Sequence, residues 1–178
     1  MRRRCDGSLE AGGAKGAWVP HVGEARGRRG RWILIRVQVQ VHSGAAVSEA
    51  ALDRAVRTVL SAEGVSEAEV SLTLLDDPAI AEMHGRYLGT QAPTDVLSFA
   101  LHDEGEPPLG DIYIGHETAS RRAAELGVAA GEELLRLAVH GLLHILGYDH
   151  PDVGRYESPM FKRQEDLVSR ILAEEEAM

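Results

Sequence analysis

Three histidines stand close together in the C-terminal half of the chain, at His140, His144 and His150. On a helix, His140 and His144 lie on one face, one turn apart. Gly147 can end that helix in a left-handed turn, after which the chain can fold back and bring His150 to the other two. Three converging imidazoles leave a coordination position open, which is the arrangement that a catalytic zinc ion uses.

The segment that carries two of these histidines, Glu132 to Leu146, is the most apolar helix that the sequence predicts. Apolar residues lie on nearly every side of it, so we expect it to be buried. An unpaired polar nitrogen costs about 1–3 kcal/mol to bury, so these imidazoles need partners. They could be core histidines bonded to backbone carbonyls, but the spacing of all three favours a metal site.

Other polar residues give weaker indications. Asp149 could orient the ring of a metal ligand, or it could simply belong to the Gly-Tyr-Asp turn in which it lies. His84 and His116 are candidates to line the cleft. No residue stands out as a general base, so the sequence leaves the catalytic residues unassigned.

The composition bounds the class of protein. The chain has 178 residues, 44% of them hydrophobic, which predicts one domain with a substantial core. It has no run of about eighteen apolar residues, which argues against a membrane span. Cys5 is the only cysteine, so no intrachain disulfide is possible. The basic start Met1–Arg4 lacks the apolar stretch of a signal peptide, and we predict a cytoplasmic protein.

Charge divides the chain in two. Residues 1–31 carry a balance of +5 without any helical or strand period, and we expect a disordered tail. The alternatives are a start codon placed too far upstream, or a basic arm that contacts nucleic acid. Residues 32–178 form the single predicted domain with a balance of −14, which makes a poor general binder of polyanions. The arginines considered for a local basic rim are Arg54, Arg57, Arg86, Arg121, Arg122 and Arg136.

The hydrophobic patterns predict an α+β fold, in which a mixed four-stranded sheet is packed by about five helices. The strands are predicted at 33–42, 70–74, 94–99 and 111–114. The helices are predicted at 48–64 with Ser48 as N-cap, 77–89 with Asp77 as N-cap, from His116 or Thr118 to Gly127, at 132–146, and from Ser158 onward. The helix at 132–146 is zincin-like, because it carries two histidines four residues apart.

The spacing of His140, His144, Gly147 and His150 resembles the metzincin pattern His-Glu-x-x-His-x-x-Gly-x-x-His. In those zinc peptidases the second position holds the glutamate that acts as general base, whereas here it is Gly141. The chain has the ligands of a zincin without its base, so a zinc metallopeptidase is an alternative rather than the first choice.

A second resemblance is closer. The stretch His140–His150 reads His-Gly-Leu-Leu-His-Ile-Leu-Gly-Tyr-Asp-His, and the motifs Pro93–Phe99 and Leu109–Ile112 precede it. In order and spacing, all three resemble the motifs of the YbeY family of bacterial endoribonucleases, over roughly residues 33–175. The resemblance implies an α+β fold around a four-stranded sheet. It also implies one zinc ion, with the three histidines as its ligands.

The same resemblance implies a function. By this resemblance, the chain would be a single-strand-specific, metal-dependent endoribonuclease. It would act in ribosomal RNA processing, at the 3′ end of the small-subunit RNA, and in ribosome quality control. The partners would be single-stranded RNA, ribosomal RNA or the small ribosomal subunit. A further alternative is a non-enzymatic ribosome-associated factor with a structural zinc; against it, no fourth Cys or His ligand is evident near the three histidines.

One position departs from the family pattern. Members commonly carry an arginine, thought to serve activity, directly after the tyrosine that corresponds to Tyr87, and here that position is Leu88. Arg86, on the other side of Tyr87, could substitute, although a helix turns about 100° per residue and points it elsewhere. The binding of phosphate therefore has no assigned residue.

Overall fold

The structure is a computed structural model that describes residues 23–26, 32–41, 44–151 and 153–177. Its strands are β1 (Gly23–Arg26), β2 (Trp32–Gln40), β3 (Glu67–Leu75), β4 (Val96–Ala100) and β5 (Leu109–Gly115). Its helices are α1 (Glu49–Ala62), α2 (Asp77–Leu88), α3 (His116–Leu126), α4 (Ala130–Ile145) and α5 (Pro159–Glu176), with a short 3₁₀ turn η1 (Arg155–Glu157) before α5. The predicted α+β class is confirmed, and so are its four strands.

The strands form one mixed sheet in the order β1-β2-β3-β5-β4. The central strands β2, β3 and β5 run parallel, while β1 and β4 pair antiparallel at the two edges. The edge strand β1 corrects the expectation of a tail for Gly23–Arg26, because backbone pairing with β2 needs no hydrophobic alternation. The rest of residues 1–31 lies outside the described residues, and its disorder stays a prediction.

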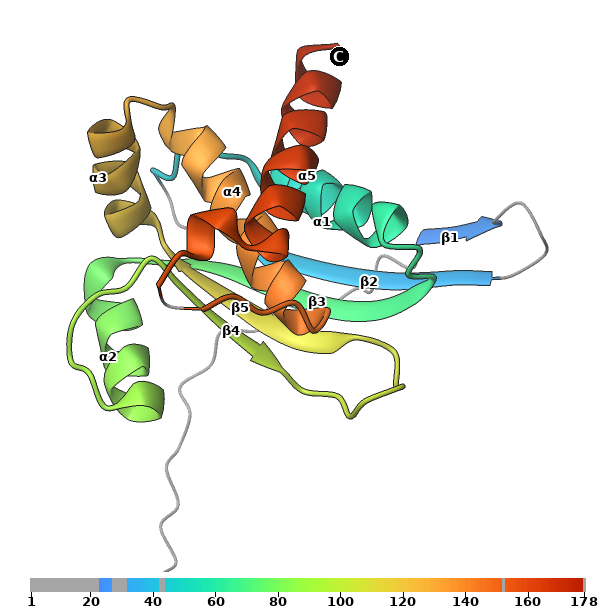
Figure 1. Ribbon diagram of the computed structural model, residues 1–178, viewed down its shortest axis with the longest axis horizontal. Helices are drawn as coiled ribbons and strands as arrows, with labels where there is room; N and C mark the ends of the chain where they lie inside the picture. Colours follow the sequence, from blue (N-terminus) through green and yellow to red (C-terminus); the bar gives the residue numbers. More distant parts are fainter. Residues whose placement is uncertain (1–22, 27–31, 42–43, 152, 178) are drawn as a thin grey trace, which may run out of the picture.

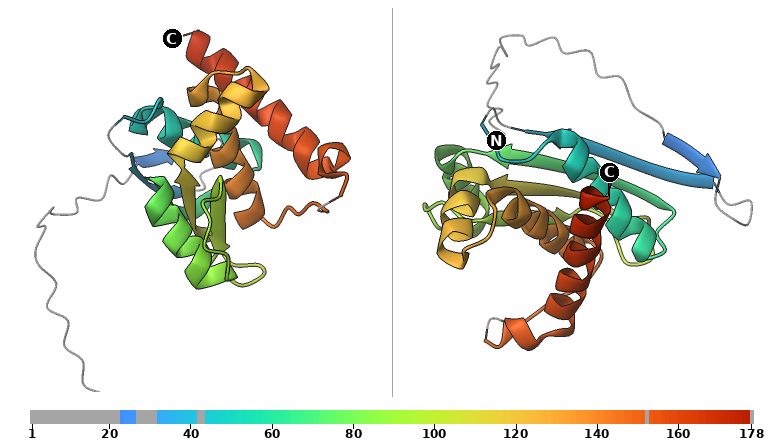
Figure 2. Two further views of the ribbon diagram at one scale, coloured as in Figure 1. Left: turned by 90° about the vertical axis from the view of Figure 1, so that its left-hand side faces the viewer. Right: turned by 90° about the horizontal axis from the view of Figure 1, so that it is seen from above.

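The helices lie in a layer on the sheet. Figure 1 shows α1, α3, α4 and α5 above the strands, and α2 on the lower side beside the end of β5. Figure 2 shows the same layer from the side and from above, with the C-terminal end of α5 projecting away from the sheet. The parallel pair β2 and β3 is joined through α1, as parallel neighbours require a crossover.

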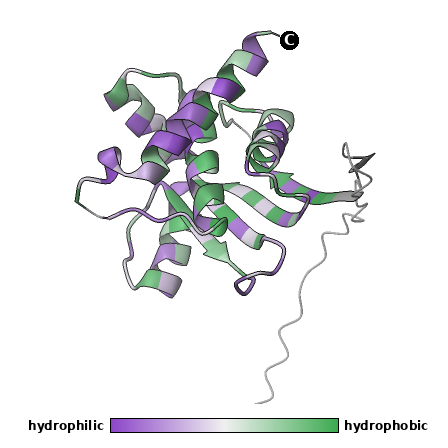
Figure 3. Ribbon diagram, turned by 45° about the vertical axis from the view of Figure 1, so that its right-hand side comes forward, coloured by the Kyte–Doolittle hydropathy of each residue, from purple (hydrophilic) through white to green (hydrophobic). Residues whose placement is uncertain are grey.

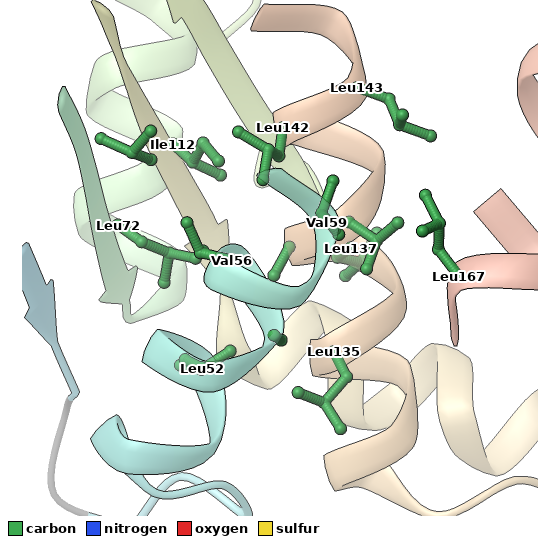
Figure 4. Close-up of a cluster of buried hydrophobic side chains, with 14 of the residues drawn as sticks. Leu52, Val56, Val59, Leu72, Ile112, Leu135, Leu137, Leu142, Leu143 and Leu167 are labelled. Atoms are coloured by element: carbon green, nitrogen blue, oxygen red, sulfur yellow. The ribbon is translucent and has the colours of Figure 1, made fainter. Parts of the chain in front are cut away.

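The core lies between the sheet and this layer. Val70, Leu72 and Leu74 of β3 are buried, while the residues between them face the other side, as the period of a strand dictates. Figure 3 shows the result as alternating hydrophobic and hydrophilic bands along the strands. In Figure 4, leucines and valines of α1, α4 and α5 meet β3 and β5; those labelled include Leu52, Val59, Leu72, Ile112, Leu142 and Leu167.

The helix caps confirm two predictions and correct one. Ser48 accepts a hydrogen bond from a backbone N–H in the first turn of α1, as predicted, and Ser158 does the same for α5, whose start the sequence predicts at this residue. The N-cap of α2 is Asp76 rather than Asp77. Asp76 has extended backbone angles and accepts from Ala79 N at 2.9 Å, whereas the Asp77 carboxylate accepts from Thr118. Asp76 and Asp77 are adjacent and equally suitable as N-cap residues, so the sequence alone does not distinguish them.

The histidine-bearing helix α4 approaches the sheet through two glycines. A Cβ atom on Gly141 would lie 2.9 Å from Ile112 Cγ2 of β5. A Cβ atom on Gly110 would lie 2.6 Å from Phe99 O and 2.7 Å from Ile145 Cδ1. Both positions therefore require glycine, and the close approach fixes α4 against β4 and β5.

None of the helices in the described part of the chain combines the length and the hydrophobicity that crossing a bilayer demands.

Candidate metal centre

The three histidines converge as the sequence predicts. Helix α4 ends in a Schellman-type turn, where Tyr148 N bonds to Leu143 O and Gly147 has a φ of +88°. The following loop returns His150 to α4, so that its ring centroid lies 5.2 Å from that of His140 and 5.1 Å from that of His144. One potential ligand atom from each histidine lies within 4.8 Å of the others.

Each imidazole has a carbonyl oxygen beside its Nδ1. The pairs are His140 Nδ1 with Gln164 Oε1 at 2.8 Å, His144 Nδ1 with Tyr148 O at 3.1 Å, and His150 Nδ1 with Pro151 O at 3.3 Å. Because a carbonyl oxygen can only accept, each Nδ1 carries the proton and each Nε2 presents a lone pair. The proton positions follow from these neighbours.

Among the described residues, no hydrogen-bond donor faces the three lone pairs. The Nε2 atoms of His140 and His144 are 3.1 Å apart and are both acceptors. The Nε2 atom of His150 is buried and has no hydrogen-bond partner in the described part of the chain. Unsatisfied buried acceptors are costly, and a single cation between them would satisfy all three. The residues present therefore fit a metal ion bound by three imidazole nitrogens.

The electrostatics keep the rings in the form that binds metal. Burial lowers the pKa of His140, and repulsion from the other two histidines lowers it further, against the hydrogen bond to Gln164. Burial also lowers the pKa of His144, against the bond to the Tyr148 carbonyl. Both imidazoles are therefore neutral near pH 7, as metal ligation requires.

A relay of hydrogen bonds from α5 holds the ring of His140. Gln164 is 3% exposed, and its Nε2 donates to Glu165 Oε1 at 2.8 Å, which turns its oxygen toward His140. Arg136 Nε in turn donates to Glu165 Oε1 at 3.2 Å. Sequence reasoning missed Gln164; the available indication was a glutamine four residues after Met160, on the buried stripe of α5.

A second set of contacts holds the loop between α4 and α5. The Tyr148 hydroxyl donates to Glu63 Oε2 at 2.8 Å, and Arg163 Nε binds Glu63 Oε1 at 2.7 Å. The hydrogen bond to Glu63 raises the pKa of Tyr148, and burial adds to this. Glu63 thereby ties the loop to the end of α1, and the Tyr148 carbonyl stays facing His144.

Asp149 takes the simpler of its two predicted roles. Its carboxylate accepts from the backbone N–H of His150 at 2.7 Å, so it shapes the turn. The ring nitrogens of the three histidines are oriented by other groups.

The histidines line a cavity of about 470 Å³. Leu88 lines it, so the position where the family commonly has arginine contributes no charge. Arg86 is exposed and lies outside the lining, which argues against its substituting for that arginine. His84 and His116, the weaker candidates to line the cleft, are also outside the lining.

The arginines proposed for a basic rim do not form one. Four pairs account for most of them: Arg54 with Glu175, Arg57 with Asp53, Arg121 with Asp77, and Arg122 with Asp95. Arg122 and Arg136 do lie in the cavity wall, but both contact the fully buried carboxylate of Glu133. Their charge is neutralised locally, so they leave little attraction for a polyanion.

The comparisons with known proteins agree with these motifs. The family model of the endoribonuclease YbeY matches residues 37–172. The chain belongs to the YbeY endoribonuclease family. It is 48% identical over 132 residues to the endoribonuclease YbeY of Moorella thermoacetica, covering 67% of this chain and 84% of that protein. It is 40% identical over 152 residues to that of Mycolicibacterium gilvum, covering 78% and 84%.

Membership of the YbeY family confirms the resemblance found in the sequence and makes the chain an endoribonuclease, a hydrolase. The solution structure of TM1509 from Thermotoga maritima has the same fold, with a TM-score of 0.60 and 24% identity over 79% of this chain and 92% of that one. The likeness of α4 to the zincins, beyond the spacing of its histidines, stays a prediction.

Replacing Gln164 by Ala removes the oxygen that orients His140. We expect the affinity for zinc, measured by competition with a chromogenic chelator, to fall by about 10–100-fold, as is typical when such an outer hydrogen bond is lost. Gln38→Ala, at an exposed position of β2, is the matched control. Equal affinities in the two variants would show that Gln164 does not support the site.

The metal-free protein should lose stability on acidification. Because burial lowers the pKa values of His140 and His144, the unfolded chain takes up these protons at a higher pH than the folded chain. The free energy of unfolding should fall as the pH drops below about 6.5, and level off once both folded-state values are passed. Urea unfolding across this range measures it. A His140→Gln, His144→Gln double variant should show a shallower dependence, and equal slopes would contradict the argument.

Proposed function

We propose that this chain is a zinc-dependent, single-strand-specific endoribonuclease, in which His140, His144 and His150 hold one zinc ion. The observation that carries the proposal is the set of unsatisfied Nε2 lone pairs that meet at one point of the cavity. Membership of the YbeY family supplies the class of reaction, and the donor set supports the metal.

The chemistry of the donors favours zinc over a hard cation. Imidazole nitrogen suits zinc and other late transition metals, whereas magnesium and calcium prefer oxygen ligands. Only the three histidines make up the group of potential ligands found among the described residues. Three protein ligands with an open position are typical of a catalytic zinc, whereas a structural zinc has four. This disfavours the alternative of a non-enzymatic factor with a structural zinc.

A zinc ion bound there would lower the pKa of a bound water molecule to about 7 and would act as a Lewis acid on a phosphoryl oxygen. The chain's own residues position this chemistry. The carbonyl oxygens of Gln164 and Tyr148 hold two of the rings. Leu137, Met160 and Phe161 give the cavity an apolar side that limits the access of water.

The size of the cavity supports an unpaired strand as substrate. Its volume of about 470 Å³ lies in the range of small-ligand sites, a size that suits one nucleotide of an unpaired strand better than a duplex. By the resemblance to its family, we further propose that the substrate is ribosomal RNA, at the 3′ end of the small-subunit RNA. Participation in ribosome quality control, contact with the small ribosomal subunit and a cytoplasmic location belong to the same proposal.

The packing of α4 disfavours the peptidase alternative. The glutamate of a zinc peptidase would occupy position 141, where even a Cβ atom would lie 2.9 Å from Ile112 Cγ2. The position faces the sheet, so a longer side chain there would displace β5 rather than enter the cavity.

Removing the metal or one of its ligands should abolish cleavage. We expect chelation of the wild type, and the variant His144→Ala, each to lower the cleavage rate of a single-stranded oligoribonucleotide by about a hundredfold or more. Added zinc should restore the chelated enzyme only, and a duplex of the same sequence should stay intact. His84→Ala, a histidine outside the cavity, is the control. Undiminished cleavage by the chelated enzyme or by His144→Ala would refute the proposal.

A further inference from the structure

The histidine cavity continues into a second hollow of about 470 Å³, which Pro93, Thr94 and residues of α3 border. The two hollows share lining residues, which we call the saddle: Asp95, Arg122, Arg155 and Tyr156. In Figure 1 the corresponding elements, the start of β4, α3 and the turn before α5, lie beside one another on the same side of the molecule. A chain that enters the cavity can therefore leave it across the saddle.

Arg155 is the cation of the saddle without a carboxylate partner among the residues that the structure describes. Arg122 binds Asp95 and Glu133. Around Arg155, by contrast, the described part of the chain places no carboxylate within ion-pair distance; its Nη2 donates to the Tyr156 hydroxyl at 3.3 Å. Its guanidinium carbon lies 5.2 Å from the centroid of the Tyr156 ring, and the side chain is exposed. Sequence reasoning left Arg155 out of the candidates for a basic rim.

The position of Arg155 is fixed by the turn that carries it. Ser158 Oγ donates to Arg155 O at 2.6 Å and accepts from Phe161 N, so η1 is tied to the start of α5. The ring of Tyr156 packs edge-on against Phe161, with centroids 5.1 Å apart. A guanidinium held over a supported aromatic ring loses less conformational freedom when it binds an anion.

We propose that Arg155 binds a backbone phosphate of the RNA strand at the saddle, with Tyr156 as its positioning residue. The strand then runs from the histidine cavity into the hollow beside α3. A guanidinium matches the geometry of phosphate oxygens. Within the described ranges, the lack of an ion-pair partner distinguishes Arg155 from the paired arginines of the cavity wall. This inference rests on the proposed action on single-stranded RNA.

The test is the steady-state kinetics of Arg155→Gln, with its zinc content verified, on a single-stranded oligoribonucleotide. KM should rise about tenfold while kcat changes by less than about twofold, because a strand contact is lost and the metal site is intact. The slope of log(kcat/KM) against log salt should flatten by about 0.7, the value of one phosphate contact on a single strand. Arg155→Lys should keep the slope, since it keeps the charge.

A second variant and a control separate the roles. Tyr156→Leu should raise KM by about threefold, the amount that loss of an exposed cation–π contact corresponds to. Arg170→Gln, an exposed arginine of α5 paired with Glu174 and outside both hollows, should behave as wild type.

Two results would overturn the inference while leaving the proposed function standing. One is an Arg155→Gln variant with the KM and salt slope of wild type. The other is a loss of kcat together with zinc, which would place the effect at the metal site. A wild-type enzyme that cleaves no single-stranded RNA would instead refute the proposed function, and this inference with it.

Discussion

Three imidazole lone pairs face one another in a half-buried pocket, where a single cation between them would satisfy all three. The oxygens beside the Nδ1 atoms of His140, His144 and His150 leave the protons on the outer side of each ring, which forces the Nε2 atoms to be acceptors. Holding three acceptors side by side costs free energy that a bound metal ion would recover. Such a cost, held in place by specific contacts, indicates function rather than packing.

The elements around the histidines serve this geometry. Gly110 and Gly141 allow α4 to lie close to the sheet, Glu63 ties the returning loop to α1, and Gln164 reaches from α5 to the ring of His140. The chain carries a net negative charge, and an RNA substrate is also negative, so the positive groups near the histidine cavity matter for binding. Among the residues that the structure describes, most arginines form ion pairs with carboxylates. On our proposals, the binding of RNA therefore depends on the metal and on cations without such a partner, such as Arg155.

The sequence predicted what depends on local spacing. The i, i+4 histidines, the left-handed turn at Gly147 and the alternation of Val70, Leu72 and Leu74 follow from helix and strand periods, and the structure has all of them. It could not predict contacts between distant segments, because these depend on how the helices dock. Gln164 reaches His140, and Arg155 takes its place at the saddle, only once α5 has packed against α4. The pairing of β1 likewise rests on backbone bonds that leave no pattern in the side chains.

X-ray absorption spectroscopy at the zinc edge of the protein purified with zinc tests the central claim most directly. The account predicts one zinc ion per chain, with three imidazole nitrogens at about 2.0–2.1 Å and one further light ligand from solvent. A shell of four protein ligands, a sulfur ligand, or a protein that retains no stoichiometric zinc would contradict it. The first two would indicate a structural ion, and the third would leave the converging lone pairs without a cation.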